Sequence, residues 1–314
     1  MSEFNTPILF LIFNRPETTK KVFEQIKLVK PKQLFVAADG PRNSILDDED
    51  KCVATRSIIN EIDWPCQVKT LFRSKNLGCR LAVSTALDWF FSQVEEGIIL
   101  EDDCLPHSDF FKFCELMLKK YRDDVQVMHI SGDNFTSQSL LKQSSYFVSK
   151  IPNIWGWATW RRAWQLYDGQ LQTWQNFLDQ EKIKNIFKSR IQQAIWLEVL
   201  AKSARGQENS WDWQWTYAVF DHNGLCLNPA VNLVSNIGFT KEALHTKRIS
   251  HPWNALPIGF LNWPLVEPIS LAINANYDNY ITKTVLGTAV KYYGKKILKA
   301  CGLFNLVRKI KKYA

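Results

Sequence analysis

Short apolar runs, each followed by an amphipathic stretch, recur through the first 131 residues of this 314-residue chain. Four of them cover residues 8–13, 34–38, 68–72 and 98–100, and residues 125–130 add a fifth. The first and fourth runs contain no polar side chain, which is typical of strands covered by helices on both faces. The alternation of strand and helix patterns predicts an α/β fold built on a mostly parallel sheet with flanking helices.

Helical periodicity separates these runs. It predicts helices after Pro16 and over residues 47–61, 80–94 and 110–121. Beyond residue 150 the pattern becomes irregular and aromatic, with a helix expected over 182–204 and a helix followed by short strands over 211–239. Many of the 13 tryptophans lie in this part of the chain. Aromatic side chains suit both cores and flat sugar rings, so their clustering leaves both roles possible.

Polar, loop-forming residues follow three of the predicted strands: Asn14-Arg15, Asp39-Gly40 and Glu101-Asp102-Asp103. In a parallel sheet the carboxyl ends of the strands meet at one edge, and ligands bind in the crevice beyond that edge. We therefore expect these three groups of residues to lie around one crevice.

The carboxylates of Glu101, Asp102 and Asp103 directly follow a buried apolar run, where like charges repel and burial strengthens the repulsion. Basic side chains or a metal ion must offset them. Carboxylate oxygens suit Mg²⁺ or Mn²⁺, and an ion bound by one or two of them keeps coordination positions for a diphosphate. The alternatives are an acidic surface turn, or an N-cap for the helix that begins near Asp109.

Two further loops carry groups that suit a nucleotide. Asp39 can accept a hydrogen bond from a nucleobase N–H, or can belong to a plain Asp-Gly-Pro turn. Residues 73–80, RSKNLGCR, place three cations and a glycine before a helix N-terminus, which indicates a phosphate-binding loop; a solvated basic loop is the alternative. The candidate contacts in this loop are Arg73, Asn76, Gly78 and Arg80.

The net charge of +8 belongs to the C-terminal end of the chain. Nine basic residues and no acidic ones follow Asp278, whereas residues 1–278 hold 30 basic and 31 acidic groups, a net charge of −1. This distribution argues against nucleic acid as a partner. Residues 285–300 and 303–313 place basic and apolar side chains on opposite helical faces, which predicts an anchor on an anionic membrane surface. Packing against the domain or a dimer partner is the alternative.

Seven cysteines are scattered along the chain without a Cys-x-x-Cys pair, which excludes a disulfide framework and a cysteine-based zinc site. No signal-peptide pattern precedes the first predicted strand, and no apolar stretch reaches the ~18 residues that a membrane span needs. These features predict a cytoplasmic protein that lies peripherally at the inner face of the cytoplasmic membrane.

The segments PILFLIFNRPE, VAADGPR, RSKNLGCR, GIILEDDCLP, SGDNF, WGWATWRRAW and SWDWQW follow one another along the chain. This order resembles that of the bacterial nucleotide-diphospho-sugar transferases. These are glycosyltransferases of the GT-A fold, similar in pattern to the N-acetylglucosaminyltransferase I family, which carries the same Glu-Asp-Asp form of the DxD motif. The resemblance covers roughly residues 5–250 and rests on the combined order of the motifs.

The resemblance implies roles for the polar strand ends. Asp103 would ligate Mn²⁺ or Mg²⁺, while Glu101 and Asp102 would orient the ribose and metal-bound water. The nucleotide pocket would be lined by Asn14, Arg15 and Asp39, the last of which would contact the base.

Two later residues also gain a role from the resemblance. Many GT-A enzymes use a later histidine as a further metal ligand, and His245 is the candidate here, with an ordinary loop histidine as the alternative. The pattern also places an acid in SWDWQW, where Asp212 would act as the catalytic base and partial burial would raise its pKa. Helix N-capping by Ser210 or Asp212 is the alternative. Trp155-Gly156-Trp157 is expected to shape the donor or acceptor pocket, or to form a core turn.

The sequence therefore predicts a metal-dependent GT-A glycosyltransferase over residues 1–265, with a nucleotide-binding half (1–131), an acceptor half (132–265) and a C-terminal extension (266–314). The enzyme would move a sugar from a nucleotide diphosphate, UDP in the first instance, to a glycan or lipid-linked glycan in cell-surface polysaccharide synthesis. Inversion follows if Asp212 is the base. The alternatives are a sugar nucleotidyltransferase, which would want a glycine-rich loop after the first strand, and a non-catalytic glycan- or membrane-binding module.

Overall fold

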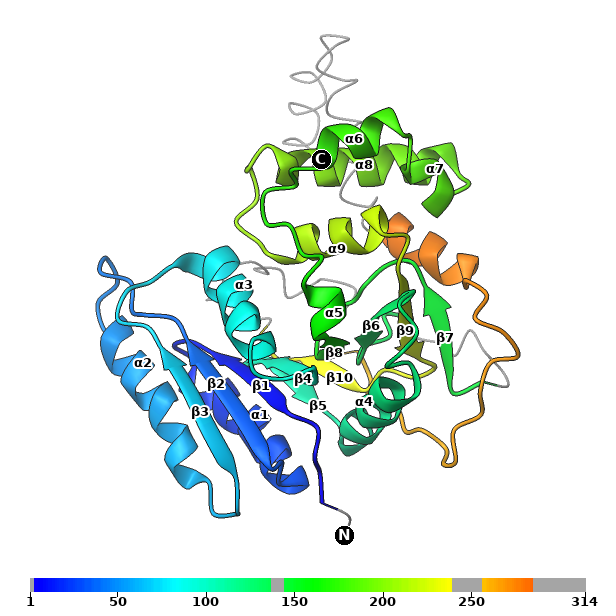
Figure 1. Ribbon diagram of the computed structural model, residues 1–314. Coiled ribbons are helices and arrows are strands. Elements are labelled where there is room, and N and C mark those ends of the chain that lie inside the picture. The colour runs from blue at the N-terminus through cyan, green and yellow to red at the C-terminus, as the bar shows by residue number, and fades with distance from the viewer. Residues whose placement is uncertain (1–2, 137–143, 239–255, 285–314) are drawn as a thin grey trace, which may run out of the picture.

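The computed structural model describes residues 3–136, 144–238 and 256–284. These residues form an eight-stranded sheet with the order β3-β2-β1-β4-β8-β6-β9-β7 (Figure 1). Its strands are β1 (Ile8–Ile12), β2 (Gln33–Ala38), β3 (Gln67–Phe72), β4 (Glu96–Glu101), β6 (Val127–Ser131), β7 (Tyr146–Ser149), β8 (Trp157–Trp160) and β9 (Leu225–Pro229). A second, antiparallel sheet pairs β5 (Cys104–Pro106) with β10 (Val234–Asn236).

The first four strands are parallel, and β1 pairs with both β2 and β4. The connecting helices are α1 (Pro16–Val29), α2 (Asp48–Ser57), which continues into the 3-10 helix η1 (Ile58–Glu61), and α3 (Gly78–Phe91). Strand β8 then pairs antiparallel with both β4 and β6, while β6 pairs parallel with β9. The predicted α/β class is confirmed, because a large, mostly parallel sheet lies between helices.

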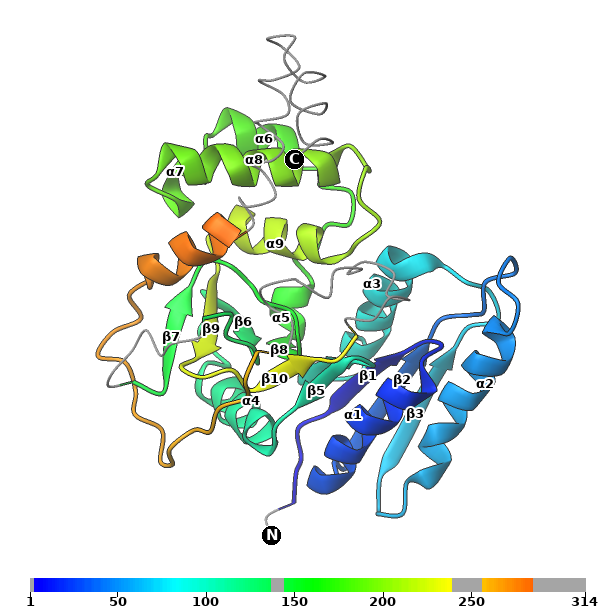
Figure 2. The ribbon, with the colours of Figure 1, turned by 180° about the vertical axis from the view of Figure 1, so that it is seen from behind.

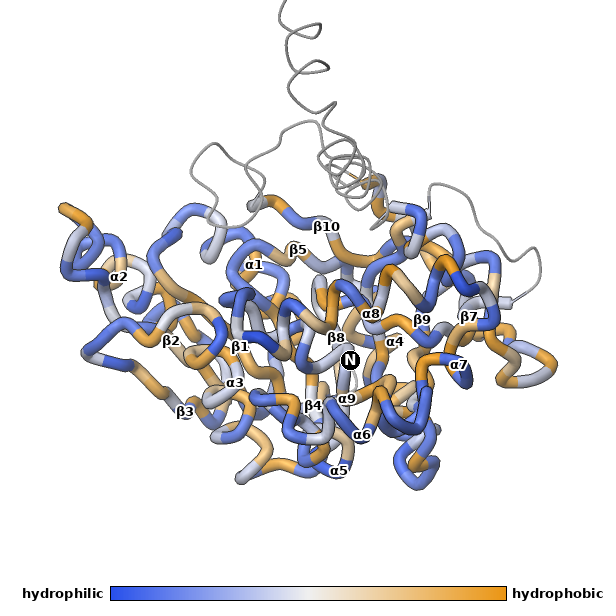
Figure 3. The backbone as a smooth tube through the Cα atoms, turned by 90° about the horizontal axis from the view of Figure 1, so that it is seen from above, coloured by the Kyte–Doolittle hydropathy of each residue, from blue (hydrophilic) through white to orange (hydrophobic). Residues whose placement is uncertain are grey.

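Alternate residues of β1 enter two different hydrophobic cores. Leu9 and Leu11 pack in the core that contains α3, whereas Ile8, Phe10 and Ile12 pack in the core that contains α1 and α4 (Ser108–Lys120). Seen from above, α1 and α3 lie on opposite sides of β1 (Figure 3), and Figures 1 and 2 show the two faces in turn. This two-sided burial explains why the run has no polar side chain.

Five short or medium helices lie between β8 and β9. They are α5 (Arg161–Trp164), α6 (Trp174–Asp179), α7 (Ile183–Ile186), α8 (Arg190–Ala204) and α9 (Asp212–Asp221). The prediction of one continuous helix over 182–204 is wrong, because Phe187 adopts an extended backbone between α7 and α8. The break lets the Phe187 ring stack on Trp196, with ring centroids 5.9 Å apart, and contact the Phe220 ring edge-on. Burial of aromatic surface outweighs helical continuity here.

A layer of tryptophans fills the core between β8 and α9. Trp157 is fully buried and stacks on Trp211, with ring centroids 5.5 Å apart, and lies 5.7 Å from Trp215. His129 also stacks on Trp157, with ring centroids 5.1 Å apart, and burial lowers the pKa of this histidine to about 3. The ring therefore stays neutral, with its Nε2 2.7 Å from the Asn153 carbonyl and its Nδ1 accepting the Trp215 indole N–H.

Residues beyond 265 return to the sheet. Ile273 forms an isolated parallel bridge with Val148 of β7, and the buried Asp278 accepts hydrogen bonds from the Ser149 hydroxyl (2.6 Å) and the Lys150 N–H (3.2 Å). The division at residue 265 stays a prediction. The basic amphipathic helices predicted over 285–313 lie outside the described residues. Within the described part of the chain, no helix is long and apolar enough to cross a membrane.

Candidate functional site

A cavity of about 490 Å³ lies at the carboxyl ends of β1, β2 and β4. Nine of the residues predicted to form the site line it: Arg15, Asp39, Arg73, Asn76, Gly78, Glu101, Asp102, Asp103 and Asp212. Asn14 and Arg80 do not line this cavity, and His245 lies outside the described residues. Residues from β-strand ends and from the N-terminus of α9 thus meet at one place, although more than a hundred positions separate them in the chain.

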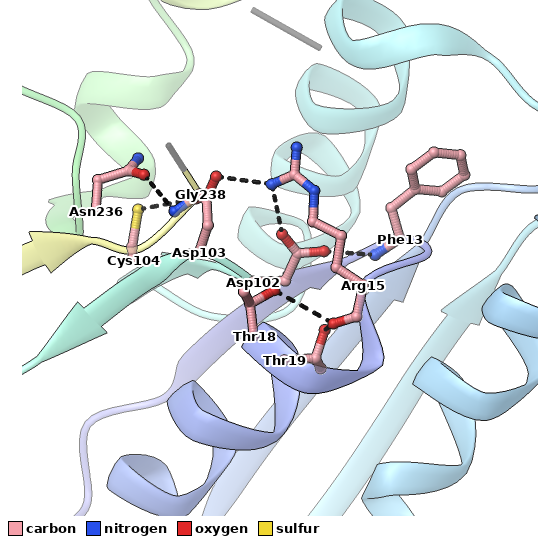
Figure 4. Close-up of polar contacts among 9 residues, drawn as sticks. All are labelled: Phe13, Arg15, Thr18, Thr19, Asp102, Asp103, Cys104, Asn236 and Gly238. Carbon is pink, nitrogen blue, oxygen red and sulfur yellow. Dashed lines mark hydrogen bonds and ion pairs between the residues drawn. The ribbon is translucent and has the colours of Figure 1, made fainter. Parts of the chain in front are cut away.

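The acidic triplet, which we define as Glu101, Asp102 and Asp103, lies at the end of β4 and in the turn to β5. Figure 4 shows two of its members, Asp102 and Asp103. The guanidinium of Arg15 contacts two of its members: Nη1 lies 2.8 Å from Asp103 Oδ2 and 3.4 Å from Asp102 Oδ1. Asp102 also accepts a hydrogen bond of 3.1 Å from the backbone N–H of Phe13. A basic side chain therefore supplies part of the positive charge that the triplet requires.

One guanidinium does not neutralise three carboxylates. Burial, together with the charges of its neighbours, raises the pKa of Glu101, and burial raises that of Asp102 against the opposing effect of Arg15. Burial would lower the pKa of Arg15, but Asp102 and Asp103 raise it above its ordinary value. Among the described residues the carboxylate of Glu101 has neither a hydrogen-bond partner nor an ion-pair partner. The site thus has an affinity for further positive charge.

Asp103 packs closely against the backbone of Gly238. A Cβ atom on Gly238 would overlap Asp103 Oδ2, so only glycine lets the chain after β10 pass so close to this carboxylate. Asn236 Oδ1 accepts the Gly238 N–H at 2.8 Å and sets the turn (Figure 4). An all-oxygen donor set with excess negative charge fits Mg²⁺ or Mn²⁺. Since no three His, Cys, Asp or Glu side chains of the described residues converge on one point, phosphate or water oxygens would have to complete the coordination.

The two alternative roles of the triplet are not supported. Asp102 is only 7% exposed, which excludes a solvated surface turn. The N-cap of α4 is His107, whose Nδ1 accepts the backbone N–H of Asp109 at 3.2 Å. The triplet therefore faces the cavity rather than capping the helix that follows it.

The carboxylate of Asp39 holds the 75–78 turn against the end of β2. Oδ1 accepts the N–H groups of Gly40 (2.9 Å) and Leu77 (3.0 Å), while Oδ2 accepts those of Leu77 and Gly78 (both 3.1 Å). Three backbone donors leave this carboxylate, which has about four acceptor positions, room for about one more hydrogen bond. Asn76 adds a 2.9 Å bond to the Gly40 carbonyl. The contact of Asp39 with a nucleobase stays a prediction, whereas the structure shows its hydrogen bonds to the 75–78 turn.

A network that sequence reasoning missed centres on Asp48, which is 1% exposed. Its carboxylate accepts hydrogen bonds from Arg42 Nε (2.9 Å), Nη2 (2.8 Å) and backbone N–H (2.8 Å), and from the Asn14 side-chain amide. The Arg42 guanidinium lies 5.3 Å from the centre of the Phe13 ring and lines the cavity. Asn14 therefore contributes to the cavity indirectly, because it supports Asp48, which positions Arg42.

Replacement of Asp48 by Asn is expected to lower the free energy of unfolding at pH 7 by about 2 kcal/mol. The hydrogen bonds of Arg42 lower the pKa of Asp48 to about 2, below its ordinary value of 3.8. A lowered pKa contributes stability above the ordinary value, and this contribution is lost as the pH falls towards 2. Urea unfolding of both proteins at a series of pH values from 7 towards 2 measures this contribution to stability. Asp47→Asn, at an exposed neighbour, is the matched control and should change stability by less than about 0.5 kcal/mol; equal effects would contradict the network.

Basic side chains and helix N-termini face the cavity from several elements. Among the described residues Arg15, Arg42 and Arg73 line it, and Arg73 Nη2 is bonded to Thr85 Oγ1 at 2.6 Å. The first residues of α3 and α9 line it as well. The positive end of the helix dipole favours anions at such ends, although at α3 the N–H groups of Leu77 and Gly78 are already bonded to Asp39. The cavity thus places anion-binding groups beside the acidic triplet.

Asp212 is the first residue of α9, and its carboxylate lines the cavity. Trp211 occupies the N-cap position and no side chain caps this helix, so the N-cap alternative for Ser210 or Asp212 is not supported. The Oδ1 atom of Asp212 is buried and has no hydrogen-bond partner among the described residues. Burial raises the pKa of Asp212 to about 6, against the backbone N–H groups of Asp212 and Trp213. An unpartnered carboxylate oxygen with a raised pKa suits proton transfer.

The aromatic wall of the cavity comes from two segments. Trp155 and Ile154 line it from the loop before β8, and Trp211 lines it from the start of α9. Trp157, by contrast, is fully buried in the core, so the two tryptophans of Trp-Gly-Trp have different roles. The sequence motif does not separate them, because strand alternation alone would put both on one face. Trp155 precedes β8, and the left-handed backbone of Gly156 (φ 66°) turns the chain between the two rings.

No protein-family model matches this sequence, and no curated protein matches it. Solved structures show a distant similarity of fold. Mouse xyloside xylosyltransferase 1 aligns with a TM-score of 0.36 over 70% of this chain and 82% of its own, at 9% identity. UDP-glucose pyrophosphorylase complexed with UDP-glucose gives 0.27 over 51% and 70%, at 10% identity. The 4-diphosphocytidyl-2C-methyl-D-erythritol synthase from Anaerococcus prevotii gives 0.32 over 55% and 77%, at 11% identity. Because these values are low, the assignment of an activity rests on the site itself.

Proposed function

We propose that the protein is a glycosyltransferase that moves a sugar from a nucleoside diphosphate, UDP in the first instance, to a hydroxyl group of a glycan. The observation that carries this proposal is the position of Asp212. This carboxylate, with its unpartnered buried oxygen, lines the same cavity as the acidic triplet and the arginines. A base and an anion site in one cavity are what sugar transfer from a diphosphate requires.

The donor diphosphate would lie against the arginines and the N-terminus of α3. Asp103, with Glu101 or Asp102, would hold a divalent cation such as Mn²⁺ or Mg²⁺. When bound, this cation supplies charge stabilisation for the departing diphosphate. Arg42, held by Asp48 beside the Phe13 ring, limits the space at the end of β1 and β2, where the nucleoside would lie.

The acceptor hydroxyl would lie between Asp212 and the anomeric carbon of the donor sugar. Its oxygen attacks that carbon from the face opposite the diphosphate, so a C–O bond to the acceptor forms while the bond to the diphosphate breaks. Asp212 accepts the hydroxyl proton, and the nucleoside diphosphate leaves with the electron pair. A single displacement of this kind inverts the anomeric configuration.

The acceptor is proposed to be a glycan or a lipid-linked glycan. Trp155, a partly buried side chain on the cavity wall, offers a flat face on which a sugar ring can stack. The lysine-rich amphipathic sequence over 285–313 extends the proposal to an acceptor presented at an anionic membrane surface.

Calorimetric titration of UDP into the protein with Mn²⁺, and again with EDTA, tests the donor site. We expect binding with Mn²⁺ and an affinity at least about tenfold weaker with EDTA, because the triplet repels the diphosphate unless a cation lies between them. Asp103→Ala should remove the metal dependence, whereas Asp123→Ala, at an exposed aspartate outside the cavity, should bind as the unchanged protein does. If neither UDP nor GDP, CDP or dTDP binds, the proposal fails.

A further inference from the structure

We propose that Arg15 is the resident cation of the acidic triplet: its guanidinium holds the place between Asp102 and Asp103 and keeps divalent metal out until a nucleoside diphosphate draws it away. This inference rests on the proposed function and adds an order to ligand binding at the same site. Metal ions and the nucleotide would enter together, and metal alone would bind weakly.

The contacts of Arg15 support this role. One nitrogen, Nη1, lies 2.8 Å from Asp103 Oδ2 and 3.4 Å from Asp102 Oδ1, so it bridges carboxylates of neighbouring residues (Figure 4). A divalent cation on Asp103 would lie about 2 Å from the same oxygen. The two positive groups cannot share that position, since they would overlap and repel.

Of the groups in this ion-pair cluster, the Arg15 guanidinium is the one that can move, because its partners and its own backbone are held in place. Asp102 is fixed by the Phe13 N–H, and Gly238 packs directly against Asp103. The backbone of Arg15 is fixed as well, because its carbonyl accepts the hydroxyl groups of Thr18 (3.3 Å) and Thr19 (2.7 Å) at the start of α1. The Arg15 side chain, however, is 29% exposed, compared with 9% and 17% for its two partners.

The other arginines of the cavity have partners elsewhere. Arg42 is held by Asp48, and Arg73 is bonded to Thr85. Within the described part of the chain, Arg15 is therefore the cation that pairs with the triplet. If it leaves, three carboxylates that line one cavity lose this counter-charge, and their affinity for a divalent cation rises.

A bound diphosphate would compete with Asp102 and Asp103 for the Arg15 guanidinium. Its oxygens match the planar fork of a guanidinium and accept two parallel hydrogen bonds, which a single nitrogen shared by two carboxylates does not make. Movement of Arg15 to the diphosphate vacates the metal position. Nucleotide and metal then strengthen each other's binding, as thermodynamic linkage requires.

Binding of Mn²⁺ alone tests the proposal. Free Mn²⁺ is followed by electron paramagnetic resonance while it is titrated with the full-length protein, without nucleotide and without turnover. We expect Arg15→Gln to bind Mn²⁺ at least about tenfold more tightly than the unchanged protein, because a positive charge next to the site has gone. Arg15→Lys retains that charge and should stay close to the unchanged protein.

Two controls locate the effect. Arg73→Gln removes a charge from the same cavity without touching the triplet and should tighten Mn²⁺ binding far less. The double change Arg15→Gln with Asp103→Asn should lose the gain. Addition of UDP should tighten Mn²⁺ binding to the unchanged protein more than to Arg15→Gln. The proposal is overturned if Arg15→Gln binds Mn²⁺ no more tightly than Arg73→Gln does, and UDP titration separately decides whether the donor site exists.

Discussion

Asp212→Asn is expected to lower kcat for sugar transfer by about 100- to 10,000-fold, the range of contributions measured for general bases. Asparagine has nearly the same size and shape but cannot accept the proton of the attacking hydroxyl. Because Arg15 pairs with Asp102 and Asp103 rather than with Asp212, the affinity for UDP should change far less than kcat. Steady-state transfer rates and UDP titration of the same preparation measure the two quantities. A variant that retains its kcat would exclude Asp212 as the base.

The same residue should set the acid limb of the pH profile. Burial raises the pKa of Asp212 to about 6. The base must be ionised to act, so kcat/KM should rise with pH up to about 6 and then level off. Since the charge of Glu208 contributes to the raised pKa, Glu208→Gln should shift this limb to lower pH and leave the plateau rate unchanged. A limb that is unaffected by Glu208→Gln but lost with Asp103→Asn would assign it to the triplet instead.

Trp157→Ala is expected to lower the free energy of unfolding by about 3–5 kcal/mol, the range for loss of a large aromatic side chain from a core. Trp157 is fully buried and contacts the rings of His129, Trp211 and Trp215. Its removal leaves a cavity below the start of α9, where Asp212 lies. Activity should therefore fall together with stability. Urea or thermal unfolding measures the loss.

Trp157→Phe and Trp155→Ala are informative controls for this substitution. The indole N–H of Trp157 has no partner within the described part of the chain, so phenylalanine removes an unsatisfied donor while it keeps most of the apolar surface. Trp157→Phe should lower the free energy of unfolding by less than half as much as Trp157→Ala does. Trp155 is only partly buried and lines the cavity, so Trp155→Ala should affect transfer more than stability. If Trp155→Ala lowered stability more than Trp157→Ala, the assignment of Trp157 to the core and of Trp155 to the cavity wall would be contradicted.

The sheet could be predicted from sequence because its signal is local. An apolar run such as 8–13 has to be buried on both faces, and the polar residues that end it have to lie at the sheet edge. The same pattern predicts that Arg15, Asp39 and the triplet lie around one crevice, and they line one cavity. Asp212 needed the resemblance as well, since an acid among tryptophans can equally begin a helix.

The partners of the polar residues could not be predicted. Asp48 occurs within an acidic run that predicts only an exposed helix start, yet its side chain is buried under Arg42 and Asn14. Asp39 was expected to face a nucleobase, and the structure shows it holding three backbone N–H groups as well. Both cases depend on where loops cross, which a one-dimensional pattern does not contain. The role of Arg15 as a counter-charge is a further case.

The position of β8 has a consequence for how the chain folds. Strand β8 (Trp157–Trp160) lies between β4 and β6, so the centre of the sheet closes only after residue 160 has been synthesised. Until then the apolar strand β4 has one unpaired edge, and such an edge pairs readily with other chains. Pairing across long sequence separations also slows folding, because loop closure costs entropy before any contact forms. A fragment ending near residue 131 would keep this unpaired edge permanently, so residues 1–131 depend on later sequence for their solubility as well as for the presence of Asp212 in the cavity.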